Sequence, residues 1–244
     1  MLDILAETRA ISTPQSDQVD VRTTLLKERV KTLQDILGAY HFTGISAKVR
    51  ELNSTNTFCI STAYEGIYLD SYYLDIQMQH PRKIISHNIP AFIPLEQTAH
   101  THLQQDLLRF MDVLRDALNA YASRRYQVEQ LQKLHTASLI GQLQRNAAYN
   151  VLKFRYQILC GDMEQDVQVK VVYRHLACYL PTGVTLTCSG ADAESVNAKL
   201  DCHRQLFEKM ELYRVFDSLK LQEELAVSSG IHSTLHSSHT PSCQ

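Results

Sequence analysis

The stretch His87–Ala99, HNIPAFIPLEQTA, separates a strand-like pattern from a helix-like one. It contains Pro90 and Pro94, four positions apart. Proline fixes φ and lacks a backbone N–H donor, so neither a paired strand nor a helix interior can run from one proline to the other. The stretch therefore predicts a rigid corner at which the chain leaves a sheet and enters a helix.

The sequence before the corner alternates as a half-buried antiparallel strand does. In YYLDIQMQ, one face carries Tyr72, Leu74, Ile76 and Met78, and the other carries Tyr73, Asp75, Gln77 and Gln79. Residues 58–62 alternate in the same way, Glu65-Gly66 predicts a turn, and a short strand is expected at 83–86. Further upstream, a helical stripe is formed by Leu26, Val30, Leu33 and Leu37.

The sequence after the corner repeats this plan. Apolar side chains follow helical spacing from residue 103 to residue 121, and the polar segment ASRR at 122–125 is expected to break that helix before a second helical run. Alternation then predicts four strands, at 152–158, 167–171, 176–180 and 184–188. A long helix is expected from about Gly190 through Leu219. Phe154, Tyr156, Leu200 and Phe207 are predicted to join this helix to the sheet.

The order helix, strands, helix thus occurs twice, which is typical of an α+β fold with helices on one face of an antiparallel meander. We predict four segments along the chain. They are a flexible N-terminal tail at 1–21, a first domain at 22–122, a second domain at 123–222 and a disordered C-terminal tail at 223–244.

Composition excludes several classes of function. Hydrophobic residues make up 44% of the 244 residues, which suffices for a packed core. Lys and Arg number 24 against 26 Asp and Glu, so we predict no direct DNA contact. No apolar run approaches the roughly 20 residues that span a bilayer, and we predict no membrane contact. The opening MLDILAETRA lacks the basic cluster of a signal peptide, so no targeting segment is expected.

Residue types that carry chemistry are scattered. The six cysteines lack the spacing of a zinc site, and no Gly-rich phosphate loop or Gly-x-Ser-x-Gly elbow occurs. His232, His236 and His239 have metal-ligand spacing, but their Ser, Thr and Pro neighbours indicate a solvated tail. We therefore predict no catalytic residue, no cofactor and no metal.

The corner resembles the Pro-x-x-x-Pro of RWD domains, although Ile89 stands where a Tyr usually precedes the first proline. Longer strings are similar, in order and separation, to the CENP-O family. These strings are ILGAYHFTGIS (36–46), CISTAYEGIYLDSYYLDI (59–76), IPAFIPLE (89–96), LQRNAAYNVLKFRYQI (143–158) and LPTGVTLTC (180–188). The resemblance extends over roughly residues 22–220. Family members usually begin with a longer coiled-coil region, and here only about 20 residues precede the first predicted helix.

The resemblance implies tandem RWD domains in a non-enzymatic subunit of the inner kinetochore, located at the centromere in the nucleus. It also implies a heterodimer with CENP-P and assembly with CENP-Q, CENP-U and CENP-R within the constitutive centromere-associated network. In such a scaffold, the proline corner would fix the crossing from the sheet edge onto its face at low entropic cost.

Two other functions fit an RWD-type fold: an adaptor in ubiquitin-type pathways and an inactive relative of ubiquitin-conjugating enzymes. The His80-Pro81 pair is similar to the His-Pro-Asn of those enzymes, but Arg82 replaces the Asn. No cysteine lies between Cys59 and Cys160 to act as the nucleophile. We expect no conjugating activity.

A partner interface is predicted in the first domain. The leucine stripe upstream is wider than one small sheet covers, and alternation forces either Tyr72 or Tyr73 onto the outer face. The predicted interface residues are Leu26, Leu33, Leu37, Tyr64, Tyr68, Tyr72 and Tyr73. Between the domains, Arg124 and Arg125 with Lys133 form a small basic patch, which we interpret as a solvated linker.

Overall fold

The structure is a computed structural model that describes residues 22–31, 44–50, 54–160, 163–188 and 194–235. The chain divides into a unit of residues 1–46 and a unit of residues 47–244. In the first unit, residues 22–31 form a helix, as the leucine stripe predicted, and its apolar side chains Leu25, Leu26 and Val30 are exposed. Leu33 and Leu37 lie outside the described residues.

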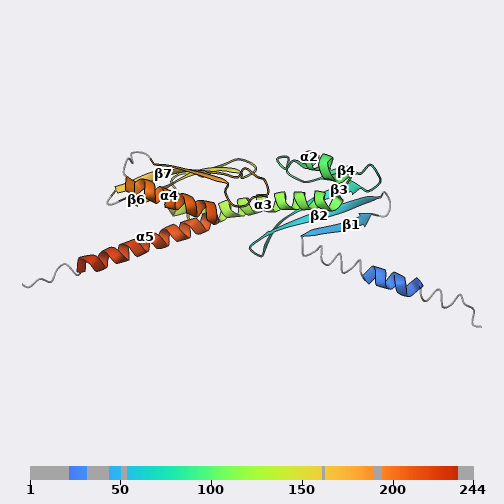
Figure 1. Cartoon of the computed structure of the whole chain (residues 1–244), viewed down its shortest axis with the longest axis horizontal. Helices are drawn as coiled ribbons and strands as arrows, with labels where there is room; N and C mark the ends of the chain where they lie inside the picture. The colour runs from blue at the N-terminus through green and yellow to red at the C-terminus, as the bar shows by residue number, and fades with distance from the viewer. Residues whose placement is uncertain (1–21, 32–43, 51–53, 161–162, 189–193, 236–244) are drawn as a thin grey trace, which may run out of the picture. The chain divides into compact units, whose positions relative to one another are not determined.

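The described residues form an α+β fold with two four-stranded sheets, ordered β1-β2-β3-β4 and β5-β6-β7-β8 (Figure 1). The strands are β1 (Ile45–Arg50), β2 (Thr55–Tyr64), β3 (Ile67–Gln77), β4 (Lys83–His87), β5 (Gln144–Arg145), β6 (Val151–Cys160), β7 (Met163–Val172) and β8 (Gly183–Cys188). The helices are α2 (Leu95–Thr98), the π-helical turn η1 (Ala99–Leu103), α3 (Leu107–Leu134), the 3₁₀ turn η2 (Thr136–Ser138), α4 (Glu194–Lys209) and α5 (Leu212–Leu235).

The first sheet is built on the β2–β3 hairpin. Glu65 and Gly66 turn the chain at φ of 51° and 77°, the left-handed pair that a two-residue hairpin requires. β2 and β3 pair antiparallel, and the inward set Phe58, Ile60, Thr62, Tyr72, Leu74 and Ile76 is buried. α3 packs against β2. The alternation in the sequence therefore predicted the buried face correctly.

The proline corner is confirmed. β4 ends at His87 and α2 begins at Leu95, so neither a strand nor a helix crosses the two prolines. The Ile93 N–H donates to the Pro90 carbonyl at 3.0 Å, which closes a turn between them. Asn88 fixes the exit from the sheet, because its side-chain oxygen accepts from the Tyr73 N–H at 2.6 Å.

α3 runs without interruption from Leu107 to Leu134, so the expected break at 122–125 is wrong. Asp106 caps its first turn by accepting from the Arg109 N–H at 2.9 Å. Ala122, Ser123 and Arg124 are buried within the helix. A polar run does not end a helix when its side chains find partners inside the protein. The predicted domain boundary at 122/123 falls within this helix and stays a prediction.

The second sheet carries the larger aromatic core. β6 and β7 pair along their whole length, from Val151↔Val172 to Cys160↔Met163, and β8 pairs with β7. Phe154, Tyr156, Leu200 and Phe207 are buried in one cluster, as predicted, and the rings of Phe154 and Phe207 lie 5.9 Å apart. α4 packs against β8 and α5.

Three features of the second half differ from the prediction. The expected strand at 176–180 is a series of turns, the expected single helix is split into α4 and α5, and the short β5 was not predicted. At 176–180 and at the start of α5, buried side chains of α3 bind the backbone. A fourth difference is the length of α5, which continues to Leu235, whereas the disordered tail was expected from residue 223. The helix extends beyond the core because backbone hydrogen bonding propagates a helix once it has started.

Candidate interaction surfaces

The tip of the β2–β3 hairpin contacts the start of α5 through Tyr64. Its hydroxyl donates to Glu211 Oε1 at 3.0 Å, and its ring lies edge-on to Tyr179 with 5.9 Å between centroids. Burial, together with the charge of Glu211, raises the pKa of Tyr64 far above its ordinary value. Tyr64 therefore stays protonated and serves as a hydrogen-bond donor in a junction between the two sheets.

Glu65, the next residue of the same turn, binds α5 a second time. Its carboxylate accepts from the Tyr213 hydroxyl at 2.6 Å and from the Arg214 guanidinium. Burial, together with the hydrogen bond to Glu65, raises the pKa of Tyr213 to about 12. Tyr64 and Glu65, at the tip of the hairpin, thus hold the start of α5.

Arg125 of α3 binds the first sheet through Asp70. Its Nη2 lies 2.8 Å from Asp70 Oδ2, and the Tyr72 hydroxyl donates to the same oxygen at 3.2 Å. Burial, with the Asp70 charge, raises the pKa of Tyr72 well above its ordinary value. About a quarter of each side chain of the ion pair is exposed, so the pair contributes modestly to stability.

Arg124 of α3 is fully buried and binds the second half of the chain. Its Nη1 donates to the carbonyls of Leu176 and Cys178 at 3.0 and 2.7 Å, and its Nη2 donates to the carbonyl of Ala148 at 3.3 Å. Burial lowers the pKa of Arg124 from its ordinary value. Because these carbonyls accept from Arg124, the segment around residue 176 is a loop around a guanidinium and not a strand.

Gln127, one turn further along α3, links that loop to α5. Its Nε2 donates to the Tyr179 carbonyl at 3.0 Å, and its Oε1 accepts from the Leu212 N–H at 3.3 Å. The second bond satisfies a donor in the first turn of α5, where the helix itself provides no acceptor. This explains why a new helix begins at Leu212.

The basic patch predicted at Arg124 and Arg125 is therefore wrong, since one residue is buried and the other is paired. The sequence spacing of the helix could have shown that Arg124 is the buried residue. Tyr121, Arg124, Val128 and Leu131 follow each other at intervals of three and four, so Arg124 occupies a position in the apolar stripe. Glu211 and Gln127 carry no such signal, because their partners come from distant parts of the sequence.

The outer face of the first sheet presents tyrosines among small side chains. Tyr73 is 51% exposed and Tyr68 is 61% exposed, whereas Tyr72 is only 7% exposed. The prediction that Tyr72 and Tyr73 lie on opposite faces is thus confirmed. Next to the exposed tyrosines lie the small polar side chains of Cys59, Ser61 and Ser71, which contact one another.

The seven predicted interface residues are therefore placed differently from one another. Tyr68 and Tyr73 lie on the outer face of the first sheet, Tyr64 lies in the junction and Tyr72 lies in the core. Leu26 is 57% exposed on the helix at 22–31. Their role in binding a partner stays a prediction.

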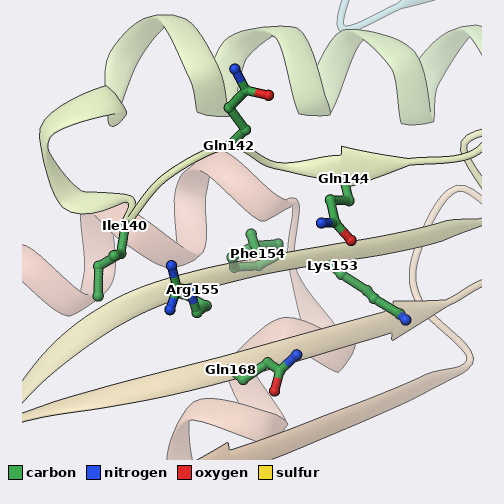
Figure 2. A pocket seen from close by; sticks show the side chains of 7 residues that line it. All are labelled: Ile140, Gln142, Gln144, Lys153, Phe154, Arg155 and Gln168. Carbon is green, nitrogen blue, oxygen red and sulfur yellow. The ribbon is translucent and has the colours of Figure 1, made fainter.

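The outer face of the second sheet is polar and contains a pocket of about 400 Å³. Figure 2 shows Lys153 and Arg155 of β6 beside Gln168 of β7, with Gln142 and Gln144 on the segment before β6. Phe154 belongs to the buried side of the same strand. This surface was not predicted, although the alternation of β6 was.

Within the described residues, no group of three or more His, Cys, Asp or Glu side chains is arranged to hold a metal. Nor does any helix there combine the length and apolarity needed to cross a bilayer. Cys59, Cys178, Cys188 and Cys202 are in no disulfide with any residue that the structure describes. His203 is buried, and its Nδ1 is hydrogen-bonded to the Tyr156 hydroxyl at 2.6 Å.

Two sheets joined by one helix and a hydrogen-bonded junction define an α+β protein. The family described as "Cenp-O kinetochore centromere component" matches residues 58–188, more than half of the chain. The chain belongs to this family. Its members are structural components of the kinetochore and not enzymes, and they are located at the centromere in the nucleus.

Individual relatives agree with this assignment. The chain is 41% identical to centromere protein O of Gallus gallus over 196 residues, 39% identical to that of Homo sapiens over 201 and 37% identical to that of Mus musculus over 221. These matches cover 80%, 82% and 88% of this chain. The chain spans 60% of the chicken relative, 66% of the human one and 74% of the mouse one.

A solved structure, "Crystal Structure of FANCL", matches with a TM-score of 0.34 and 16% sequence identity. The match covers 76% of this chain and 48% of that one. A similarity this low carries no argument about fold or function.

Proposed function

We propose that the chain is a scaffold subunit of the inner kinetochore that pairs with CENP-P and, through that pair, joins CENP-Q, CENP-U and CENP-R. Each sheet with its helices would be one RWD domain. The family supports the kinetochore context, and the resemblance described above supports the choice of partners. No step of this function requires catalysis, a cofactor or a metal.

The observation that carries the proposal is the outer face of the first sheet. Tyr68 and Tyr73 are large amphipathic side chains, of the kind enriched at protein interfaces, and both are more than half exposed. The side chains between them are small and uncharged, so a partner could approach the sheet closely there. Asp75, on the same face, already accepts from the hydroxyls of Thr57 and Ser86 at 2.6 and 2.7 Å. A stable complex would be expected to bury at least ~1,000 Å² there and on neighbouring elements.

The helix at residues 22–31 gives separate support. Leu25, Leu26 and Val30 are exposed on it, and three large apolar side chains within two turns favour a protein partner over solvent. They belong to the other compact unit of the chain, so they are a second, independent candidate for partner contact.

The adaptor and inactive-conjugating-enzyme alternatives are not favoured, because the family match is to kinetochore components. The Arg82 backbone and guanidinium are also already used within the fold. The N–H of Arg82 donates to Gln104 Oε1 at 2.8 Å, and its Nη1 donates to the carbonyl of Leu103 at 3.0 Å.

The test is co-expression of the full chain with CENP-P, followed by size-exclusion chromatography with light scattering. The proposal expects a one-to-one complex with CENP-P, and expects the chain alone to self-associate. A monodisperse monomer whose mass does not change in the presence of CENP-P would reject the pairing.

A further inference from the structure

The outer face of the second sheet collects positive charge. Successive strand residues point to opposite faces, and the outward set contains Lys153 and Arg155 on β6 and Lys170 on β7. Their uncharged neighbours on the same face are Gln168, Thr185 and Thr187. The face therefore carries three cations around its centre, and two acids, Asp166 and Glu164, lie on it toward the β6–β7 turn.

These cations form no ion pair within the part of the chain that the structure describes. Lys153 lies directly opposite Lys170, an arrangement of like charges that destabilises a strand pair. No ion pair among the described residues involves Lys153, Arg155 or Lys170. The nearby acid, Asp166, is opposite Gln157, whose Nε2 lies 3.4 Å from Asp166 Oδ1. The central cluster of like charges, with its acids displaced toward one end of the face, suggests an anionic partner.

A pocket of about 400 Å³ lies over part of this face (Figure 2). Two of the cations, Lys153 and Arg155, line it, and the amides of Gln142, Gln144 and Gln168 lie around them. No acidic side chain lines the pocket. The volume falls within the range of ligand pockets, and the amides can donate to carboxylates or pair with a peptide backbone.

We propose that this face, defined by Lys153, Arg155 and Lys170 with the three glutamines, binds an acidic peptide segment of a partner protein. Arg155 suits a carboxylate because its guanidinium can donate two parallel hydrogen bonds. The ligand chemistry is an anionic side chain on a peptide, either a Glu or Asp carboxylate or a phosphorylated Ser. A nucleic-acid duplex fits less well, because its affinity comes from neutralising many phosphates and this face offers three cations.

Fluorescence anisotropy with the full chain tests this directly. The probe is a labelled octaglutamate peptide, with octaglutamine as the uncharged control. A peptide of the same length with phosphoserine at alternate positions identifies the preferred anion, and a labelled 20-base-pair DNA duplex tests the competing class. We expect octaglutamate to bind and octaglutamine not to bind. Binding should weaken as salt rises from 50 to 300 mM, because the contacts are exposed and screened.

The decisive variant is Lys153→Glu/Arg155→Glu, for which we expect at least a tenfold loss of octaglutamate affinity. The matched control is Lys83→Glu/Arg109→Glu, which makes the same charge change on β4 and α3 and should keep affinity within about twofold. Lys153→Gln/Arg155→Gln, which removes the charges without reversing them, should show an intermediate loss. Thermal unfolding of each variant establishes that it is folded, and the neutral variant carries the test if the reversed one is not.

Three results would overturn the inference. One is failure of both anionic peptides to bind the wild type. Another is equal loss in the two charge-reversed variants, which would indicate net charge and not this face. The third is tighter binding of the duplex than of either peptide. The inference does not depend on pairing with CENP-P, since the peptide assay uses the chain alone.

Discussion

The two sheets share a strand order and a pattern of alternation, yet their outer faces differ in chemistry. The first presents exposed tyrosines among Cys59, Ser61 and Ser71, without a charge between them. The second presents Lys153, Arg155 and Lys170 without a neutralising acid at the centre. From this repeated architecture with divergent surfaces we infer that the inward residues preserve the fold while the outward residues distinguish partners. The predictions below test that separation, in order of decreasing effect.

The largest effect is expected in the core of the second half. Phe207 is fully buried and its ring contacts those of Phe154, Tyr156 and Phe216. Phe207→Ala should lower the free energy of unfolding by about 3–5 kcal/mol through lost burial and the cavity that remains. Urea unfolding followed by circular dichroism measures this loss of stability. The control is Leu206→Ala, at the neighbouring side chain, which is partly exposed. Equal effects of the two changes would place Phe207 outside the core.

Arg124 should matter nearly as much, although it is charged. Arg124→Met fits the space but leaves three carbonyls without their donor, and it should cost about 3 kcal/mol. Arg124→Lys keeps the charge but not the fork of donors, so it should recover only part of the loss. Urea unfolding compares the three proteins. A methionine variant as stable as the wild type would show that the guanidinium does not organise the loop.

Acid should destabilise the second half through His203. Burial, with the charge of nearby Lys199, lowers the pKa of His203 to about 4, and its Nδ1 is hydrogen-bonded to the Tyr156 hydroxyl. The unfolded chain, with a histidine pKa near 6.5, binds the proton first. The stabilisation is therefore complete above pH 6.5 and is lost as the pH falls toward 4, amounting to about 2 kcal/mol after allowance for solvent screening.

The measurement is the stability difference between wild type and His203→Gln across this range, because the carboxylates common to both proteins then cancel. His135, whose pKa burial also lowers, acts in the same direction and is present in both proteins. A difference that does not change between pH 7 and pH 4 would contradict the assignment.

The contact between α3 and the first sheet should contribute a smaller amount. Asp70→Asn weakens the hydrogen bonds from Arg125 and Tyr72, and because the pair is partly exposed we expect a loss of about 1 kcal/mol. Asp116→Asn removes a more exposed ion pair with Arg115 and serves as the control, with an expected change near zero. Thermal unfolding of both variants makes the comparison. A larger loss from Asp116→Asn would mean that the Arg125 contact does not hold α3 against the first sheet.

Local pattern predicted much of this fold. The alternation of Leu152, Phe154 and Tyr156 identified a buried face, and the two prolines identified the corner, because each signal depends on neighbours in the sequence. The loop at 173–182 was missed because its carbonyls bind Arg124, a contact across more than 50 residues. Likewise, alternation separated Tyr72 from Tyr73. It could not place Tyr64 against Glu211, since that pair lies 147 residues apart.

The most direct test of the central claim is a pair of binding measurements on the same variants. Affinity for CENP-P is measured by isothermal titration for the wild type, Tyr73→Ser and Lys153→Glu/Arg155→Glu. Tyr73 is exposed and its ring packs in no core, so the serine variant should fold normally yet bind CENP-P at least tenfold more weakly. The charge-reversed variant should bind CENP-P as the wild type does and lose only the octaglutamate peptide. Loss of CENP-P binding in the charge-reversed variant, with full binding by Tyr73→Ser, would contradict the assignment of separate partners to the two faces.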